Sequence, residues 1–175
     1  MSELHRVPTA ERPDLLAKPV VGALGSADGV EVSEIDPEVA DTAAFCEKYG
    51  WAMEQSANCV VVEARREGRR WLAACVVLAT TRADVNKLVK KKLGASKLSF
   101  APMEKAVAES GMEFGGITPI GLPEDWPVLI DGAVAASNEV VIGSGIRKSK
   151  LFLSGAKLVE LSKGEVIENL AFRVV

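Results

Sequence analysis

Two apolar runs separated by a short charged segment constrain the fold of this chain more than any other feature. The runs cover residues 58–64 and 71–79, and residues 65–70 between them are mostly charged. Both runs have the length and composition of buried strands, and Gly68 can adopt the positive φ that a tight connection requires. We therefore predict a buried β-hairpin, whose strands follow each other with no room for a crossover helix.

The remaining predicted elements are short and closely spaced. Further strands are predicted at residues 30–35, 97–101, 128–135, 139–142, 150–153 and 166–172. Helices are predicted at residues 14–24, with a break or kink at Pro19, and at 41–50, 84–94, 102–111 and 155–161. Consecutive strands without crossover helices exclude a doubly wound sheet, so we predict an α+β fold with a mixed, partly closed sheet flanked by helices.

Capping signals mark two of these helices. Asp41 and Asp84 can each accept a hydrogen bond from the free N–H groups of a first helical turn. Gly50 and Gly94 can end the same two helices, because glycine adopts the left-handed conformation without steric cost. These four residues fix the expected boundaries of both helices.

Length and composition indicate one globular domain without a general affinity for polyanions or lipids. The chain has 175 residues, of which 48% are apolar, and a formal net charge of −3. This is enough for one well-buried core and gives no overall attraction to nucleic acid or membranes. No charged-then-apolar leader opens the chain and no apolar run approaches the ~18 residues of a membrane span, so we predict neither a signal peptide nor a membrane partner.

The cysteines indicate a reduced protein of the cytoplasm. Cys46, Cys59 and Cys75 are odd in number, have apolar neighbours and form no C-x-x-C pair. We therefore expect free thiols in the core, and neither a metal nor another cofactor.

The N-terminal residues differ in character from the rest. We expect an N-terminal extension at residues 1–27, with a short helix, followed by the functional domain at residues 28–175. Residues 1–13 mix charges with Pro8 and Pro13 and are expected to be poorly ordered. His5, the only histidine, lies there.

Two glycine-rich loops are the candidate centre of function. The first is Gly115-Gly116-Ile117-Thr118-Pro119-Ile120-Gly121, and the second, after another apolar run, is Gly143-Ser144-Gly145. Glycine lets the backbone approach a ligand closely and present its N–H groups, while Pro119 pushes Thr118 towards an extended conformation. The alternative is structural, with each loop a sharp turn beside a buried strand.

The order of these motifs resembles that of a known family. A capped helix from Asp41 to Gly50, the strand Asn58-Cys59-Val60-Val61-Val62, the hairpin, the two glycine loops and Leu158 follow one another as in the YbaK/prolyl-tRNA synthetase editing-domain superfamily, from about Val30 to Leu161. The resemblance implies a β-barrel-like mixed sheet with outer helices. It also implies trans-editing, which is hydrolysis of the ester that joins a wrong amino acid to the 3′ end of a tRNA.

The resemblance also assigns roles to single residues, with one departure. The family's catalytic pattern has a lysine at the start of the strand, where this chain has Asn58. Asn58 cannot replace an ammonium as an ion partner, although its amide can hydrogen-bond to a ribose hydroxyl or an attacking water. Asp131 lies in a region where the family often has an aspartate, and could engage the substrate's amino group or orient a water. Asp131 could equally end a strand in a turn with Gly132.

The chain offers no conventional catalytic set. The sole His5 lies in the expected tail, so no Ser-His-Asp or Cys-His arrangement can be assembled. An aminoacyl ester is already activated, so aligned water and loop N–H groups at Gly115, Gly116 and residues 143–145 could suffice, one donor being worth about 2.7–4 kcal/mol. The substrate's ribose hydroxyl or thiol could act as nucleophile or base. The residues expected to line the substrate site are Thr118, Pro119, Gly121, Gly143, Ser144 and Gly145, and the two hydroxyls could instead only satisfy their own loops.

Two basic clusters are the candidates for contact with the tRNA backbone. One lies on the predicted helix at 84–94 and the other follows the second glycine loop, and their members are Lys87, Lys90, Lys91 and Lys92, and Arg147, Lys148 and Lys150. Phosphates would bind there if both clusters lie at one rim, although each cluster alone has the composition of a solvated surface. Aromatic residues for base stacking are scarce, so sequence-specific recognition of single strands or of DNA is not predicted.

The resemblance therefore implies an aminoacyl-tRNA hydrolase, a carboxylic ester hydrolase acting on mischarged tRNA. Its expected partner is the 3′ end of an aminoacyl-tRNA, with an aminoacyl-tRNA synthetase as a further option. Apolar pocket walls would select a small amino acid by size, at only about 1–3 kcal/mol per methylene. The alternative is a non-catalytic module that kept the pocket, lost the lysine, and binds an aminoacyl-tRNA, a nucleotide or a protein.

Overall fold

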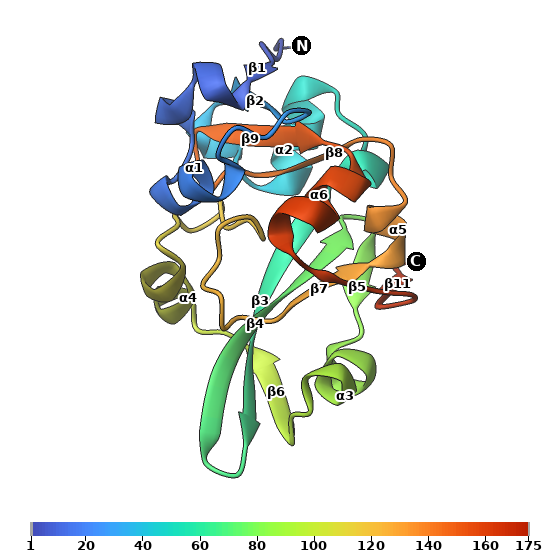
Figure 1. Cartoon of the computed structure of the whole chain (residues 1–175). Coiled ribbons are helices and arrows are strands. Elements are labelled where there is room, and N and C mark those ends of the chain that lie inside the picture. Colours follow the sequence, from blue (N-terminus) through green and yellow to red (C-terminus); the bar gives the residue numbers. More distant parts are fainter. Residues whose placement is uncertain (1, 175) are drawn as a thin grey trace.

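A long β-hairpin is the central element of the computed structural model, which describes residues 2–174 (Figure 1). Strand β3 (Ala57–Arg66) pairs antiparallel with β4 (Arg69–Leu78), with Arg66 opposite Arg69. Glu67 and Gly68 connect them, both at positive φ (49° and 79°). The predicted hairpin is confirmed, but its turn is shorter than the expected 65–70, because positive φ at both central residues matches the twist of the paired strands.

The hairpin belongs to a mixed five-stranded sheet in the order β10-β7-β4-β3-β6. The other strands are β6 (Lys97–Phe100), β7 (Val128–Asp131) and β10 (Glu165–Ile167). β6 pairs antiparallel with β3, whereas β7 runs parallel to both β4 and β10.

A second, four-stranded sheet lies beyond the start of β3, in the order β1-β2-β9-β8. Its strands are β1 (Val7–Pro8), β2 (Glu31–Glu34), β9 (Ser149–Leu153) and β8 (Val140–Gly143). A parallel bridge between Ser56 and Val141 links the two sheets. A small third sheet pairs β5 (Thr81–Ala83) with β11 (Ala171–Arg173). The predicted α+β fold with a partly closed sheet is confirmed.

The helices lie around these sheets as short segments (Figure 1). They are α1 (Lys18–Leu24), α2 (Thr42–Tyr49), α3 (Lys90–Leu93) after a π-helical turn (Val85–Val89), α4 (Met103–Ser110), α5 (Gly132–Ala135) and α6 (Gly155–Ser162). Single 3-10 turns occupy Thr9–Glu11, Pro13–Leu15, Pro37–Val39 and Met53–Gln55. The predicted caps are confirmed, since Asp41 and Asp84 accept N–H groups of their first turns and Gly50 and Gly94 are left-handed.

Two predicted strands are wrong in extent. The run at 128–135 is a strand only to Asp131, and the chain turns into α5 at Gly132. The run at 166–172 is divided into β10 and β11 by Asn169, which has a φ of 59°. In the N-terminal segment, the predicted helical run at 14–24 is broken: a 3-10 turn ends at Leu15, Leu16 and Ala17 are extended, and α1 starts at Lys18 with Pro19 in its first turn.

The N-terminal segment is ordered, which corrects the expectation for residues 2–13; Met1 lies outside the described residues. β1 pairs with β2, and the N–H of His5 donates a hydrogen bond to Ser33 Oγ. The Arg6 guanidinium donates to both carboxylate oxygens of Glu139. Local composition could not predict this order, because the partners are distant in sequence.

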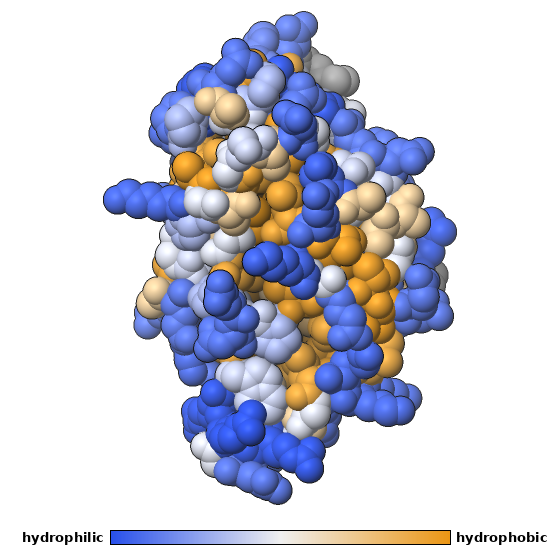
Figure 2. Space-filling view, in the orientation of Figure 1, coloured by the Kyte–Doolittle hydropathy of each residue, from blue (hydrophilic) through white to orange (hydrophobic). Residues whose placement is uncertain are grey.

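The buried residues form three apolar clusters. The largest joins the N-terminal segment to both sheets through side chains such as Val20, Ile130 and Leu151. A second contains Val89 and lies between the five-stranded sheet and the π-helical turn, and a third packs Phe45 of α2 against Phe152 of β9. Hydrophilic side chains cover the tip of the β3-β4 hairpin, at the bottom of Figure 2.

Candidate functional site

The two glycine loops meet through their backbones. The N–H of Gly145 donates to the carbonyl of Gly116 at 2.7 Å. A Cβ on Gly116 would lie 2.7 Å from the Ile146 carbonyl oxygen, and a Cβ on Gly143 would lie 2.6 Å from that of Gly116. Real Cβ atoms do not approach so closely, so only glycine allows this contact. The predicted convergence of the loops is present.

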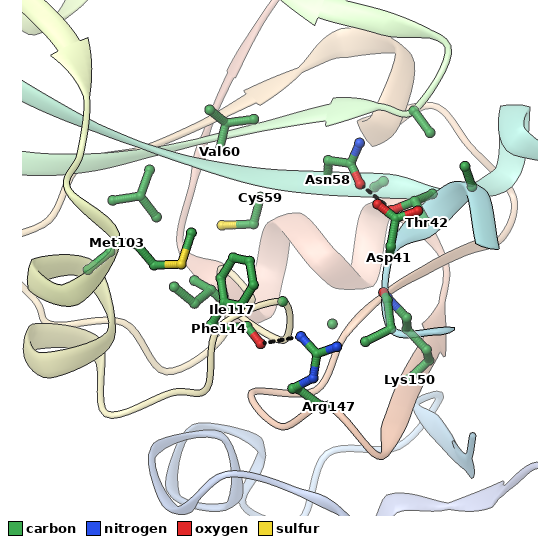
Figure 3. Close-up of a pocket in the computed structure, with 18 of the residues that line it drawn as sticks. Asp41, Thr42, Asn58, Cys59, Val60, Met103, Phe114, Ile117, Arg147 and Lys150 are labelled. Atoms are coloured by element: carbon green, nitrogen blue, oxygen red, sulfur yellow. Dashed lines mark hydrogen bonds between the residues drawn. The ribbon is translucent and has the colours of Figure 1, made fainter. Parts of the chain in front are cut away.

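A cavity of about 670 Å³ opens beside this contact and beside the first residues of β3 (Figure 3). Gly115 and Gly143 line it from the loops, and Asn58 lines it from the strand. Further lining comes from the start of α2, from β3, from α4, from the first glycine loop with the residue before it, and from the β8-β9 connection and β9. It includes Asp41, Thr42, Cys59, Val61, Met103, Ala106, Phe114, Ile117, Arg147 and Lys150. The cavity has the size and shape of a small-molecule site.

One side of this cavity is apolar. Cys59 and Val61 from β3 face Met103 and Ala106 of α4 and Ile117 of the first loop across it. Burial raises the pKa of the Cys59 thiol, so this sulfur acts as a small apolar surface rather than as a nucleophile. The contribution of α4 was not predicted from the sequence, because α4 lies next to the cavity only through the tertiary fold.

Asn58 is tied to the start of α2. Its Oδ1 accepts a hydrogen bond from Thr42 Oγ1 at 2.6 Å, which leaves the amide nitrogen as the donor end of the side chain (Figure 3). Asp41 caps the same helix by accepting the N–H of Ala44 at 3.2 Å. The strand and the helix therefore place three polar side chains at one end of the cavity.

Arg147 joins the first glycine loop to the chain before α2. Its Nη1 donates to the Phe114 carbonyl at 3.1 Å and its Nη2 donates to the Pro37 carbonyl at 3.0 Å. Its backbone N–H donates to Glu113 Oε1 at 2.7 Å. The guanidinium also lies over the Phe114 ring, 5.7 Å from its centroid. Half-buried Arg147 and exposed Phe114 thus form one rim of the cavity, while Lys148 is exposed and does not line it.

Lys150 is the unexpected member of the site. It lies in β9 and is only 7% exposed, yet it lines the cavity. Its Nζ donates to the Ala40 carbonyl at 2.9 Å and lies 5.6 Å from the centre of the Phe45 ring. Burial lowers the pKa of Lys150 from 10.5 to about 8. The sequence predicted Lys150 to be part of a surface cluster, although its position five residues after Gly145 of the second glycine loop was a signal for the cavity.

Asp131 is not brought to the cavity. It is buried at the end of β7, where its Oδ1 accepts the Leu170 N–H at 3.1 Å. Burial raises the pKa of this carboxyl group, against the lowering effect of the backbone N–H groups around it. Its geometry corresponds to the structural alternative, a carboxylate that supports a chain turn.

Several predicted loop donors are already used within the protein. The N–H of Gly116 donates to the Glu113 carbonyl at 2.9 Å, and that of Gly145 donates to Gly116. Within residues 2–174, the N–H of Gly115 has no such acceptor, so it is the better candidate donor of the first loop.

The other residues predicted to line the substrate site lie in the loops but outside the cavity lining. Thr118 is fully buried and Pro119 is buried, and neither lines the cavity, while Gly121 packs against the Pro19 carbonyl. Ser144 Oγ lies 2.6 Å from Ser149 Oγ and is also buried. The Ser144 hydroxyl therefore satisfies its own loop and the neighbouring strand, whereas the buried Thr118 hydroxyl has no hydrogen-bond partner among residues 2–174.

The two basic clusters do not share one rim. Lys90 lines a separate groove with Lys97, Arg65 and Glu63, and Lys87 and Lys91 are exposed and line neither this groove nor the cavity. Lys92 pairs with Glu165 at 2.8 Å. Arg147 therefore remains the predicted tRNA contact with direct access to the cavity.

The described residues give no sign of a metal centre or a membrane span. Between residues 2 and 174, no three His, Cys, Asp or Glu side chains gather closely enough to hold a metal ion. None of the helices in that range has the length and apolar character needed to cross a bilayer.

Comparison with known proteins assigns the family. The family model described as "Aminoacyl-tRNA editing domain" matches residues 36–161, which include the whole cavity lining. The chain belongs to the aminoacyl-tRNA editing domain family. No curated protein gives a significant match.

Solved structures share the editing-domain fold at low sequence identity. A candidate trans-editing enzyme for prolyl tRNA synthetase is 21% identical, with a TM-score of 0.73 over 87% of this chain and 94% of that one. The hypothetical protein APE2540 is 18% identical, with a TM-score of 0.76 over 89% of this chain and 100% of that one. At this level of identity the likeness establishes the fold, and the chemistry must come from the residues of this chain.

Proposed function

We propose that this protein is a trans-editing hydrolase that cleaves the ester between a wrong amino acid and the 3′ end of a tRNA. The observation that supports this most directly is the cavity beside the backbone contact of the two glycine loops, within the segment that matches the editing domain. Its size suits an aminoacyl-adenosine end and not a folded nucleic acid.

The lining suggests how the substrate lies. The aminoacyl side chain would contact the apolar wall of Cys59, Met103 and Ile117. The ribose and ester would lie near the amide of Asn58 and the N–H of Gly115. The terminal phosphate and base would stay at the exposed rim, near Arg147 and Phe114, since a guanidinium suits phosphate and an aromatic face suits a base.

The chemistry would depend on alignment and electrostatics. The imidazole of His5 is exposed on the segment that pairs with β2, outside the cavity lining, so no histidine base is available there. A water molecule, aligned by protein donors or by the substrate's own ribose hydroxyl, would attack the ester carbonyl carbon. The bond to the ribose oxygen would break, and the proton of the water would pass to that oxygen.

The test is release of amino acid from a panel of correctly charged and mischarged tRNAs by the purified protein. We expect release above the buffer rate for at least one small apolar amino acid on a noncognate tRNA. Arg147→Ala should weaken binding of that substrate, and Lys18→Ala, at an exposed site outside the cavity, should not. No release across the full panel would contradict the proposed reaction.

The rival function, binding without catalysis, is an outcome of the same assay. A gain of hydrolysis from zero in Asn58→Lys would indicate a retained pocket without chemistry. Little change, or a loss, would indicate that Asn58 is part of a working site.

The proposed partners follow from the substrate. They are the 3′ end of an aminoacyl-tRNA in the cytoplasm and, where editing is coupled to charging, the synthetase that makes the error. We propose residues 28–175 as the editing domain, with residues 1–27 as an extension that supports it: the N–H of Ala17 donates to the Ser144 carbonyl, behind the second glycine loop.

A further inference from the structure

Lys150 is a buried ammonium group whose compensation by the protein consists of one carbonyl and the face of the Phe45 ring among the described residues. An ammonium has three N–H donors, and among residues 2–174 the Ala40 carbonyl is its one hydrogen-bond acceptor. No carboxylate of the described residues lies within ion-pair distance of Nζ. A buried charge that lacks a partner is costly to folding, and such groups cluster at functional sites.

The spare donors are next to the cavity. Lys150 is paired in register with Gly143, the glycine that permits the contact of the two loops, and both residues line the cavity. Figure 3 shows the Lys150 side chain extending towards Asp41 at the end of the cavity where Asn58 and Thr42 meet. Both glycine loops therefore border the space into which this ammonium can donate.

We propose that Lys150 contacts the substrate and stabilises the negative charge that develops on the ester carbonyl oxygen during hydrolysis. This inference rests on the proposed function and adds the residue that supplies the positive charge. Water forms the new bond to the carbonyl carbon, the bond to the ribose oxygen breaks and that oxygen takes the proton of the water. Lys150 stays protonated throughout and acts only as a hydrogen-bond donor.

The depth of Lys150 separates this role from phosphate binding. The phosphate must remain connected to the rest of a tRNA and so stays at the rim, where Arg147 is more exposed than Lys150. The ester lies between that rim and the apolar wall. A buried ammonium there acts with little screening by water, which strengthens its effect on a developing oxyanion.

The charged and titratable groups around Lys150 determine when it is protonated. Asp41 and Cys46 of the α2 region favour its charged form, while burial and the nearby Arg147 favour the neutral form. Burial dominates and lowers the pKa of Lys150 to about 8. Hydrolysis above the buffer rate should therefore fall as the pH rises through about 8, where free ester hydrolysis instead accelerates.

The first test compares Lys150→Met with the wild type under single-turnover conditions. We expect the rate constant to fall about 10²–10³-fold, the effect of removing one oxyanion donor, with the protein concentration at half-maximal rate changed by less than about threefold. Lys18→Met, at an exposed lysine outside the cavity, is the matched control and should keep the wild-type rate. An unchanged rate constant in Lys150→Met, or a change in half-saturation alone, would overturn the proposal.

The second test moves the charge within the cavity. In the double variant Lys150→Met with Asn58→Lys, an ammonium returns to the same cavity from β3, and we expect part of the lost rate to be restored. Lys150→Gln, which keeps a donor without the charge, should recover less. Equal rates in all three variants would show that charge is irrelevant there.

A binding measurement separates failure of this inference from failure of the proposed function. The probe is adenosine bearing a 3′-phosphonate analogue of a small aminoacyl ester, whose anionic tetrahedral centre mimics the reacting carbonyl; a 3′-amide analogue mimics the ground state. We expect Lys150→Met to weaken phosphonate binding at least about tenfold and amide binding little. If no tRNA of the panel is hydrolysed but Lys150→Met still weakens binding of the phosphonate more than binding of the amide, only the proposed hydrolysis is wrong. If hydrolysis occurs and both analogues bind Lys150→Met as they bind the wild type, only the role of Lys150 is wrong.

Discussion

Two buried charges lie near opposite ends of strand β3, Glu63 of the strand itself and Lys150 of β9, and their surroundings differ. Near the hairpin tip, Glu63 is 3% exposed and its carboxylate accepts hydrogen bonds from Arg65 at 3.0 Å and Lys105 at 2.8 Å. Beside the start of the strand, Lys150 is almost as buried but has one carbonyl as its hydrogen-bond acceptor among the described residues. Glu63 is satisfied by the protein, whereas Lys150 keeps donors for a ligand.

The comparison shows how a structural charge differs from a functional one. The two cations lower the pKa of Glu63, mainly through the Lys105 hydrogen bond, and so favour its charged form in the folded state. Burial lowers the pKa of Lys150, and so disfavours its charged form. A charge that folding disfavours is retained at the expense of stability, which is expected where it serves function.

The largest expected effect on stability is a gain from Lys150→Met. The wild type bears the cost of a buried ammonium below pH 8, so the variant should be more stable at pH 7, by at most about 3 kcal/mol for a pKa lowered from 10.5 to about 8. As the pH rises from 8 to 10.5, the folded wild type loses this proton while the unfolded chain keeps it. The gain should therefore shrink to near zero by pH 10.5. Urea unfolding at several pH values measures it, and a variant less stable at pH 7 would break the comparison.

Gly116→Ala tests whether the cavity depends on the backbone contact between the two glycine loops. The new Cβ would lie 2.7 Å from the Ile146 carbonyl oxygen, so we expect a loss of about 1–3 kcal/mol, the usual cost of overpacking, and a loss of hydrolysis. The control is Gly22→Ala in α1, where a Cβ meets nothing within 4 Å. Equal thermal stability of the two variants would show that the loops can separate without cost.

Glu63→Gln tests the opposite end of the strand. Its cationic partners reach solvent, so the lost charge-assisted hydrogen bonds should cost only about 1–2 kcal/mol at pH 7. Because the pKa of Glu63 is lowered in the folded state, the difference should be complete above about pH 4.5 and vanish as the pH falls through the folded value. Hydrolysis should be unchanged. A large loss of activity with little loss of stability would assign Glu63 to function.

Arg70→Ala should have the smallest effect. Its guanidinium lies 4.0 Å from Glu63 and is 59% exposed, so we expect a change in unfolding free energy below about 0.5 kcal/mol. Lys105→Ala, at 2.8 Å from the same carboxylate, is the comparison variant and should cost more. The same urea series measures both, and equal costs would show that distance does not separate these pairs.

Local signals predicted much of the fold. The β3-β4 hairpin and the capping by Asp41 and Asp84 follow from residues close together in sequence, which is why they are confirmed. The order of residues 2–13 depends on pairing of β1 with β2 and on Arg6 with Glu139, and no local pattern contains such contacts.

The site was predictable only in outline. Gly116 and Gly143 allow the close backbone approach of the two loops, so the glycines in both loops indicated the contact that the loops make. Asp131 was misleading because a carboxylate after an apolar run looks the same whether it faces a ligand or supports a turn. Lys150 was placed at the surface because lysine is rarely buried without a partner, and only the tertiary fold reveals such an exception.

The most direct test of the whole account is an NMR titration of the wild-type protein with a non-hydrolysable 3′-amide analogue of an aminoacyl-adenosine. We predict saturable shifts of the backbone amides of Asn58, Gly115 and Lys150, while those of Glu63 and Gly68 stay unchanged. No saturable shift at the cavity residues, or larger shifts at the hairpin end of β3, would contradict an editing site between the glycine loops.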